Sequence, residues 1–315
     1  MTRSDHFHGV LLLNKPPGIS SHDAVIRVRH IAGQRSVGHC GTLDPLAEGL
    51  LVLCFGRATK ASRFLTECDK TYDAVVHLGL TSTTYDAEGL SPDAVANDVS
   101  SLNAERISRV LAQFEGAIRQ KVPVFSAVRM HGKRLYTLAR RGETVETPER
   151  EVIVRRIELL SYDEPYLHIR VECTKGTYIR TLAHGIGERL GCGAYLSHLK
   201  RIGIGHLRLE DALTLDEIAE RAARGGLQEC LLALDEVLRY GAVTVSEEFG
   251  RVVATGRQLC REDVVTVEGS FSAGDRILLK NGNGAVLAIG MAGVDSGGFN
   301  GDSDRQLFRY VRVLN

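Results

Sequence analysis

Residues 38–49 read Gly-His-Cys-Gly-Thr-Leu-Asp-Pro-Leu-Ala-Glu-Gly and lead directly into an apolar run at residues 50–55. Polar groups placed between glycines, just before a strand-like run, are typical of a loop that a buried scaffold holds in one shape. Within it, Asp44 is followed by Pro45, a pair that also marks helix starts, with Asp as the cap and Pro at the first helical position. On this stretch alone, Asp44 is either a helix cap or a functional carboxylate.

The composition is that of an ordinary globular protein. The 315 residues suffice for a large core and for two domains, and 43% of them are hydrophobic. No apolar run approaches the roughly 20 residues of a membrane span, and the first residues lack the apolar region of a signal peptide. The seven cysteines are scattered without a Cys-x-x-Cys pair, which argues against a disulfide framework and a structural zinc site. These features predict a cytoplasmic protein with free thiols.

Charge is balanced overall but segregated along the chain. The 39 basic and 39 acidic residues cancel, yet residues 119–141 contain seven Lys or Arg and no acid, whereas residues 210–236 contain eight Asp or Glu and only two Arg. Segregated charge can form a polyanion-binding face on a neutral protein. Unrelated solvated helix faces would produce the same pattern, so this observation alone leaves both interpretations open.

Periodicity predicts a mixed α and β arrangement for the first 240 residues. Strands are expected at residues 10–13, 50–55, 70–79, 152–162 and 166–174. Helices are expected at residues 21–31, 58–65, 105–114, 135–141, 178–190, 215–223 and 229–237. Residues 81–103 are polar, carry turn signals, and are interpreted as a long surface loop.

The sequence pattern changes after Tyr240. Short strands are expected at residues 264–267, 276–280, 285–289 and 308–313, and Asn-Gly-Asn-Gly at 281–284 is a strong hairpin signal. Residues 294–304 are rich in Gly and Ser and are expected to form a flexible loop. The chain is therefore divided into residues 1–240 and a small β-rich domain, residues 241–315.

Several common enzyme classes lack their motifs here. The chain has no phosphate-binding P-loop, no complete Gly-x-Gly-x-x-Gly, no His-Glu-x-x-His and no Gly-x-Ser-x-Gly. A thiol enzyme built on Cys40 and His39 has no support from spacing, because adjacent residues on an extended segment point to opposite sides. What remains is a carboxylate in a shaped loop, basic segments, and the aromatic residues Tyr72 and Tyr178, which also fit a core role.

Five ordered stretches resemble the motifs of the pseudouridine synthases of the TruB type, in their stand-alone bacterial form. Residues 38–49 resemble the catalytic motif. The others are Leu-Leu-Asn-Lys-Pro-Pro-Gly-Ile-Ser-Ser-His at 12–22, Lys-Thr-Tyr at 70–72, Phe-Ser-Ala-Val-Arg at 125–129 with Gly-Lys-Arg-Leu-Tyr at 132–136, and Lys-Gly-Thr-Tyr-Ile-Arg at 175–180. The match spans roughly residues 9–210, and the last 75 residues resemble, more loosely, a PUA-type RNA-binding domain.

This resemblance implies an α+β fold of the pseudouridine-synthase type, with a mixed, mainly antiparallel sheet flanked by helices, plus a small PUA-like barrel. It implies isomerisation of uridine 55 in the T-loop of tRNA to pseudouridine, by a monomer, without metal or cofactor. Asp44 matches the essential carboxylate, as nucleophile toward the ribose carbon or as base toward its neighbour. With the five motifs together, the catalytic interpretation of Asp44 is favoured over the helix cap.

The resemblance also implies roles around Asp44. Arg180 would favour the charged form of Asp44, Tyr72 would pack on the target base and relay a proton, and Tyr178 and Leu199 would complete the pocket wall. The remaining substrate-binding residues are expected to be His39, which packs where flipped bases leave a gap, Lys15, and, in a basic insertion at about residues 119–150, Arg129, Lys133 and Arg134.

Two alternatives remain. The protein could be an RNA-binding or tRNA-folding protein whose catalysis is secondary, which the basic segments and the C-terminal domain motivate. It could also be related to the guide-RNA-dependent pseudouridine synthases, which share the Gly-Thr-Leu-Asp-Pro core, although residues 122–141 resemble the stand-alone type. Cys40 and Phe125 depart from the usual family residues, at positions that carry no chemistry in the implied mechanism.

Overall fold

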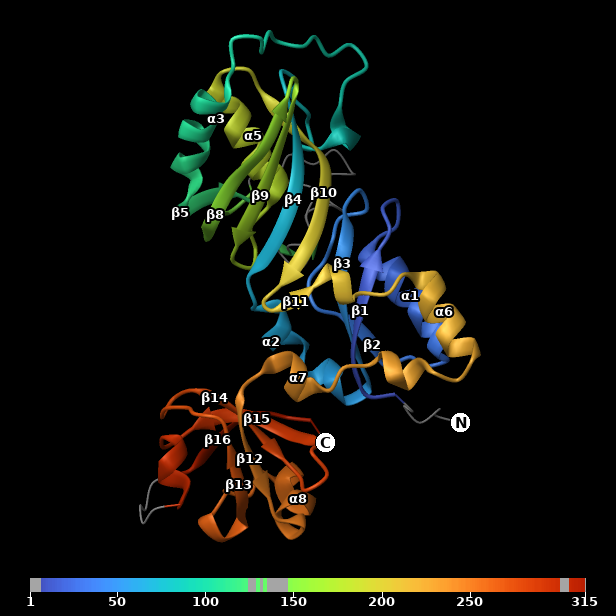
Figure 1. Ribbon diagram of the computed structural model, residues 1–315, viewed down its shortest axis with the longest axis vertical. Helices are drawn as coiled ribbons and strands as arrows, with labels where there is room; N and C mark the ends of the chain where they lie inside the picture. Colours follow the sequence, from blue (N-terminus) through green and yellow to red (C-terminus); the bar gives the residue numbers. More distant parts are fainter. Residues whose placement is uncertain (1–6, 124–128, 131–132, 135–146, 301–305, 315) are drawn as a thin grey trace.

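The computed structural model describes residues 7–123, 129–130, 133–134, 147–300 and 306–314, and of residues 129–130, 133–134 and 300 only the backbone. The chain forms two sheet-based units (Figure 1). The strands of the first unit are β1 (Gly9–Lys15), β2 (Val37–His39), β3 (Glu48–Phe55), β4 (Lys70–Leu78), β5 (Gly116–Lys121), β8 (Glu149–Asp163), β9 (Tyr166–Cys173), β10 (Ala194–Ile204) and β11 (Leu207–Arg208). A separate short pair is formed by β6 (Arg129–Met130) and β7 (Lys133–Arg134).

The first unit is a mixed sheet whose main path runs β1-β3-β10-β4-β9-β8-β5. Its neighbours are antiparallel except β3 and β10, which are parallel. The helices of this unit are α1 (Ser21–Ala32), α2 (Ser62–Thr66), α3 (Ala104–Leu111), α5 (Ile179–Leu190), α6 (Leu215–Ala223) and α7 (Leu234–Leu238). One continuous core packs α1, α3, α5 and α6 on the same face of the sheet. The predicted α+β class with a mainly antiparallel sheet is confirmed.

Local sequence explains why these elements form. The residues of β4 alternate between buried and partly exposed along its whole length, because one face meets the core and the other faces solvent. In contrast, nearly all of β3 is buried, since apolar clusters cover both of its faces. Helix α1 begins with a capping box between Ser20 and Asp23 and ends at Gly33, whose φ of 61° suits glycine.

The second unit is a five-stranded sheet in the order β13-β12-β14-β15-β16 with its own core. Its elements are β12 (Gly241–Val245), α8 (Glu247–Val252), β13 (Val264–Glu268), β14 (Arg276–Lys280), β15 (Val286–Ala292) and β16 (Phe308–Val313). The hairpin predicted at residues 281–284 is confirmed, because the Asn281 amide donates to the Ala285 carbonyl at 3.0 Å between β14 and β15.

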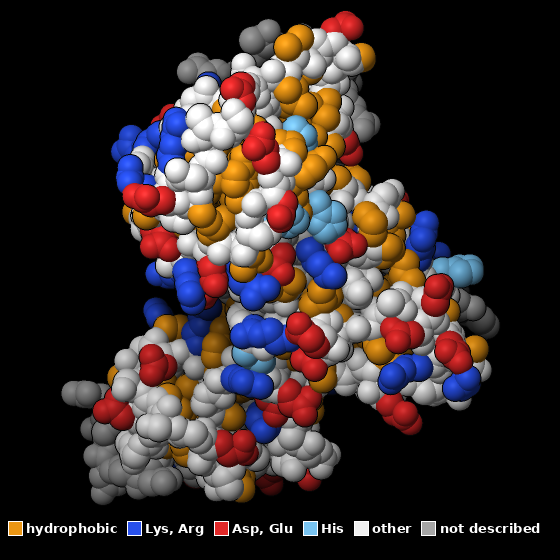
Figure 2. Space-filling model, turned by 45° about the horizontal axis from the view of Figure 1, so that its top comes forward, with side chains coloured by type: hydrophobic (Ala, Val, Ile, Leu, Met, Phe, Trp, Pro, Cys, Tyr) orange, Lys and Arg blue, Asp and Glu red, His pale blue; other side chains and the backbone are white. Residues whose placement is uncertain are grey.

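The two units share a hydrophobic cluster, which we call the junction core. It joins residues of β1, β3 and α2 to Ala242, Leu278, Ile289 and Leu314 of the second unit. Polar contacts surround it: Lys60 Nζ donates to the Leu314 carbonyl at 3.0 Å, and Arg276 forms a 2.7 Å ion pair with Glu67. Figure 2 shows basic and acidic side chains interspersed across this junction. The second unit is therefore packed onto the first rather than tethered to it.

Three expectations need comment. The helix expected at residues 229–237 is confirmed only over α7. A 3-10 turn (Leu227–Cys230) precedes it, and the two are separated by Leu232, whose backbone exchanges hydrogen bonds of 2.8 and 2.9 Å with Val10 of β1. The flexible loop expected at residues 294–304 instead contains a 3-10 turn, Ser296–Asn300, whose Phe299 is buried against Phe271. The helix expected at residues 135–141 lies outside the described residues.

Candidate active site

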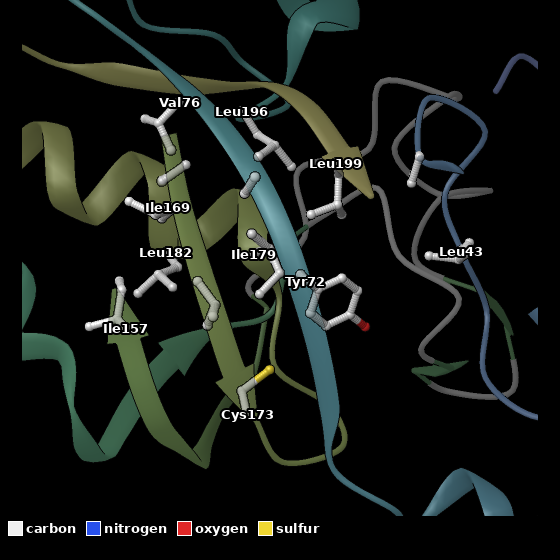
Figure 3. Close-up of a cluster of buried hydrophobic side chains, with 14 of the residues drawn as sticks. Leu43, Tyr72, Val76, Ile157, Ile169, Cys173, Ile179, Leu182, Leu196 and Leu199 are labelled. Carbon is white, nitrogen blue, oxygen red and sulfur yellow. The ribbon is translucent and has the colours of Figure 1, made fainter. Parts of the chain in front are cut away.

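A cavity of about 370 Å³ lies where five segments of the first unit meet. Its walls come from the loop before β3, the last residue of α2, the start of β4, the segment from the end of β9 into the first turn of α5, and β10 from Leu196 to Arg201. The lining residues are Gly41, Thr42, Leu43, Asp44, Thr66, Lys70, Tyr72, residues 174–180, Leu196, Leu199 and Arg201. Figure 3 shows the Tyr72 ring extending from β4 toward the loop that carries Leu43, with Leu199 above it. Five predicted residues thus meet here: Asp44, Tyr72, Tyr178, Arg180 and Leu199.

Asp44 lies in an ordered loop, residues 40–47, which we call the Asp44 loop. No helix starts there; the Ala47 amide donates to the Asp44 carbonyl at 3.1 Å and closes a turn that contains Pro45. The helix-cap interpretation is therefore wrong. Ser21 of α1 anchors the loop, because its hydroxyl donates to the Leu43 carbonyl at 2.9 Å and accepts from the Leu43 amide at 2.8 Å. These bonds leave the Asp44 carboxylate facing the cavity.

Arg180 joins two carboxylates. Its Nη2 lies 2.7 Å from Asp44 Oδ2, and its Nη1 lies 3.3 Å from Asp86 Oδ2. The side chains of Arg180 and Asp86 are 6% and 3% exposed, whereas that of Asp44 is 39% exposed. The guanidinium is thus held from behind by a buried carboxylate and presents its other edge to the carboxylate at the cavity.

The electrostatics of Asp44 follow from these neighbours. Burial raises the pKa of the Asp44 carboxyl above its ordinary value, and the charge of Arg180 opposes that rise. The Asp86 carboxylate adds to the rise, while Lys15 counters it. Asp44 is therefore more basic than a solvated aspartate, yet retains a cationic partner for its charged form.

Asp86 was not among the predicted site residues, because residues 81–103 were interpreted as a long surface loop. The structure buries it instead: its carboxylate accepts from the Glu88 amide at 3.1 Å and from the Thr84 hydroxyl. The preceding residue, Tyr85, has a φ of 65° and stacks on His184 of α5, with ring centroids 4.1 Å apart. The local sequence does not predict the contact between Asp86 and Arg180, because the two residues lie far apart along the chain.

Tyr72 and Lys70 are both buried on β4. Burial raises the pKa of the Tyr72 phenol, so it remains protonated near neutral pH and is able to donate a proton. Burial, assisted by the charge of Arg201, lowers the pKa of Lys70 to about 8. The Lys70 ammonium donates to the carbonyls of Thr66 and Cys68.

Other predicted residues do not line the cavity. Lys15 is fully buried, and its Nζ donates to the carbonyls of Pro16 and Ile19 at 2.8 and 2.9 Å. These bonds stabilise the turn that follows β1. This position disfavours the substrate contact expected for Lys15. His39 is partly buried on β2, and burial lowers the pKa of its imidazole. The side chains of Arg129, Lys133 and Arg134 lie outside what the structure describes.

The described residues contain neither a metal-binding cluster nor a membrane-spanning helix. Among these residues, no cluster of three or more His, Cys, Asp or Glu is arranged to hold a metal ion. No helix in the same ranges is long and apolar enough to span a membrane.

Family models match three consecutive parts of the chain. The N-terminal domain of the TruB family pseudouridylate synthases matches residues 29–179, the C-terminal domain of tRNA pseudouridylate synthase B matches residues 180–239, and the PUA domain matches residues 241–297. The resemblance noted from the sequence is therefore confirmed in all three parts.

Curated relatives agree. A tRNA pseudouridine synthase B of Burkholderia mallei is 49% identical over 280 residues, which cover 86% of this chain and 91% of that protein. Another, from Cupriavidus pinatubonensis, is 46% identical over 263 residues, with 82% of both chains covered.

Solved structures share the fold. The chain of a Cbf5–Nop10–Gar1 complex superposes with a TM-score of 0.73 at 25% identity, covering all of this chain and 91% of that one. The chain in the archaeal box H/ACA Nop10–Cbf5 complex gives 0.73 at 24% identity, covering 98% and 86%. The predicted pseudouridine-synthase fold is confirmed, and the chain belongs to the TruB family of pseudouridylate synthases.

Proposed function

We propose that this protein isomerises uridine 55 in the T-loop of tRNA to pseudouridine, acting as a cytoplasmic monomer without metal or cofactor. The observation that carries the proposal is the Asp44 carboxylate, held at 2.7 Å by a buried arginine at the edge of a 370 Å³ cavity. Pockets of this size hold one small ligand, which fits a single nucleoside. The relatives named tRNA pseudouridine synthase B supply the substrate class.

The reaction needs no added reactant. The N-glycosidic bond breaks, the base rotates, and a carbon–carbon bond forms between the ribose and C5 of the base, while C5 loses a proton and N1 gains one. Asp44 acts as the nucleophile, toward either the ribose carbon or the base. Tyr72, kept protonated by burial, packs on the base and relays the C5 proton.

The target uridine lies within a folded loop and is flipped into the cavity, which costs a few kcal/mol. Contact with Tyr72 offsets part of that cost, since stacking of a base on an aromatic ring contributes about 1–3 kcal/mol. Tyr178 and Leu199 line the same cavity and complete its wall. His39 fills the gap that the flipped bases leave in the tRNA.

Binding of the tRNA body is assigned to the basic insertion at about residues 119–150, with Arg129, Lys133 and Arg134 on phosphates, and to the PUA domain. Such contacts make binding weaken as salt rises. Recognition of loop shape with splayed bases is the usual mode for folded RNA.

The proposal is tested by incubating the purified protein alone with an unmodified tRNA transcript and mapping pseudouridine. We expect one modified position, in the T-loop at uridine 55. No product, or product only after a guide RNA is added, would overturn the proposal, and the second result would favour the guide-dependent alternative. A transcript with cytidine at position 55 is the matched control and should remain unmodified.

The pH dependence of the reaction tests the charge network around Asp44. Attack requires the ionised carboxylate, so the rate should fall as pH falls through the raised pKa of Asp44, above the ordinary value of about 3.9. Asp86→Asn removes a negative neighbour that raises this pKa, so the acid limb of the pH–rate profile should move to lower pH. The plateau should also fall, because Arg180 loses its anchor.

Single-turnover rates measured across the acid range check this prediction. The control is Asp69→Asn, which breaks a more exposed ion pair with Arg155 and should leave the limb unchanged. Movement of the limb to higher pH in Asp86→Asn would contradict the assigned coupling.

A further inference from the structure

Arg201 is a buried cation that binds the backbone of the Asp44 loop. It lies on β10, is 1% exposed, and also lines the cavity. Its Nη2 donates to the Gly41 carbonyl at 3.0 Å and its Nη1 to the Thr42 carbonyl at 3.3 Å. Its Nε donates to the Leu50 carbonyl at 2.8 Å, in β3. One guanidinium therefore binds the chain both before and after Asp44.

The backbone of Arg201 is also in close contact with Gly49, which follows this loop at the start of β3. Gly49 pairs with Arg201 where β3 and β10 run parallel. A Cβ atom on Gly49 would lie 2.4 Å from the Arg201 carbonyl oxygen, and Gly49 has a φ of +100°, which favours glycine. The side chain and the main chain of Arg201 together fix the course of the loop on β10.

The charge of Arg201 is costly where it lies. Among the described residues, no carboxylate forms an ion pair with it, so its charge is balanced by carbonyl dipoles rather than by an anion. Lys15 and Lys70 are buried nearby, and their burial, together with the charge of Arg201, lowers the pKa of each to about 8. An apolar side chain of similar volume would avoid this cost. If the residue at position 201 served only the stability of the fold, a third buried cation beside Lys15 and Lys70 would not be required.

We infer that Arg201 is a positioning residue, which holds the carbonyls of Gly41 and Thr42 so that Asp44 points at Arg180 and the cavity. Its planar fork reaches three carbonyls at once, a geometry that the compact ammonium of lysine does not reproduce. Arg201 is also the residue of β10 that pairs with Tyr72 of β4, so it connects the Asp44 loop with the strand that carries Tyr72. This inference deepens the proposed function and rests on it.

The test compares Arg201→Lys and Arg201→Met with Arg208→Lys. Arg208 is a matched control, because it is an exposed arginine of β11 that also donates to two backbone carbonyls, those of Gly205 and Leu207. Under saturating enzyme, both Arg201 variants should lose about 10²-fold in single-turnover rate, the loss typical of a misplacement near 1 Å. Their tRNA dissociation constants should remain within about threefold of wild type, because the residues proposed to bind the body of the tRNA lie outside the cavity.

Hydrogen exchange supplies a readout that does not depend on activity. The amides of residues 38–49 should exchange faster in the Arg201 variants, while the second unit keeps wild-type protection. The inference would be overturned if the Arg201 variants kept the wild-type single-turnover rate or lost single-turnover rate and tRNA affinity equally. Faster amide exchange throughout the chain would also overturn it. If wild type forms no pseudouridine at position 55, the proposed function fails, and the exchange experiment still decides whether Arg201 holds the loop.

Discussion

Asp44→Asn is expected to abolish pseudouridine formation, with a loss of about 10⁴-fold or more, as is common when a nucleophile is removed. The amide has nearly the same shape as the carboxylate but lacks its charge and cannot attack. Arg180 would still be paired with Asp86 at 3.3 Å, so no buried cation is left without a counter-ion. Folding and tRNA affinity should therefore stay close to wild type, with the dissociation constant within about threefold.

The measurement is the fraction of pseudouridine in the T-loop of a tRNA transcript over time. Asp73→Asn is the matched control, because Asp73 is a carboxylate of β4 whose partner is Arg170, outside the cavity, and its loss should leave the rate unchanged. Undiminished product in Asp44→Asn would exclude Asp44 as the nucleophile. The same variant also tests the binding alternative: if it supports cell function in place of wild type, the essential role is RNA binding or folding.

Arg180→Lys should reduce turnover by about 10²-fold or more while changing tRNA affinity little. Arginine reaches Asp44 and Asp86 from two different nitrogens of one rigid plane. The lysine ammonium is a single charged point on a flexible chain and cannot hold both carboxylates in that arrangement. A misplaced carboxylate loses near-attack geometry, which alone costs about 10²-fold in rate.

Turnover under saturating tRNA and the dissociation constant, measured separately, check this prediction. The control is Arg170→Lys, which changes another two-point arginine–carboxylate pair, with distances of 2.7 and 2.9 Å, on the solvent face of the sheet. That variant should retain wild-type turnover, since exposed pairs contribute little. Equal losses in turnover and affinity for Arg180→Lys would show that its pairing with Asp44 is not its main role.

Most of the fold could be predicted where the pattern is local. Alternation identified β4, and β8 and β9 stood out as a β-rich antiparallel pair. The 11-residue β10, an inner strand of the sheet between β3 and β4, was missed. Its alternation is broken by irregular register between Leu196 and His198 and between Arg201 and Gly203, and its glycine and charged residues resemble a loop. A strand held by neighbours on both sides does not need a strong pattern of its own.

The same distinction between local pattern and contacts across the fold applies to the site residues. Asp44, Tyr72 and Arg180 were found because each lies in a recognisable motif. Asp86 and Arg201 were not, because their importance depends on contacts made across the fold, with Arg180 and with the Asp44 loop. A polar loop residue and a basic residue near a glycine carry no local sign of burial.

The junction core also bears on how the chain is made. Val10 of β1 leaves the ribosome 304 residues ahead of Leu314, which lies in the same cluster. At synthesis rates of about 5–20 residues per second, the apolar face of β1 and β3 lacks its final cover for some tens of seconds. The nascent chain is therefore exposed to aggregation and to chaperones until its C-terminal domain arrives. A stop before residue 242 would remove Ala242, Leu278, Ile289 and Leu314 and leave that face uncovered in the finished product.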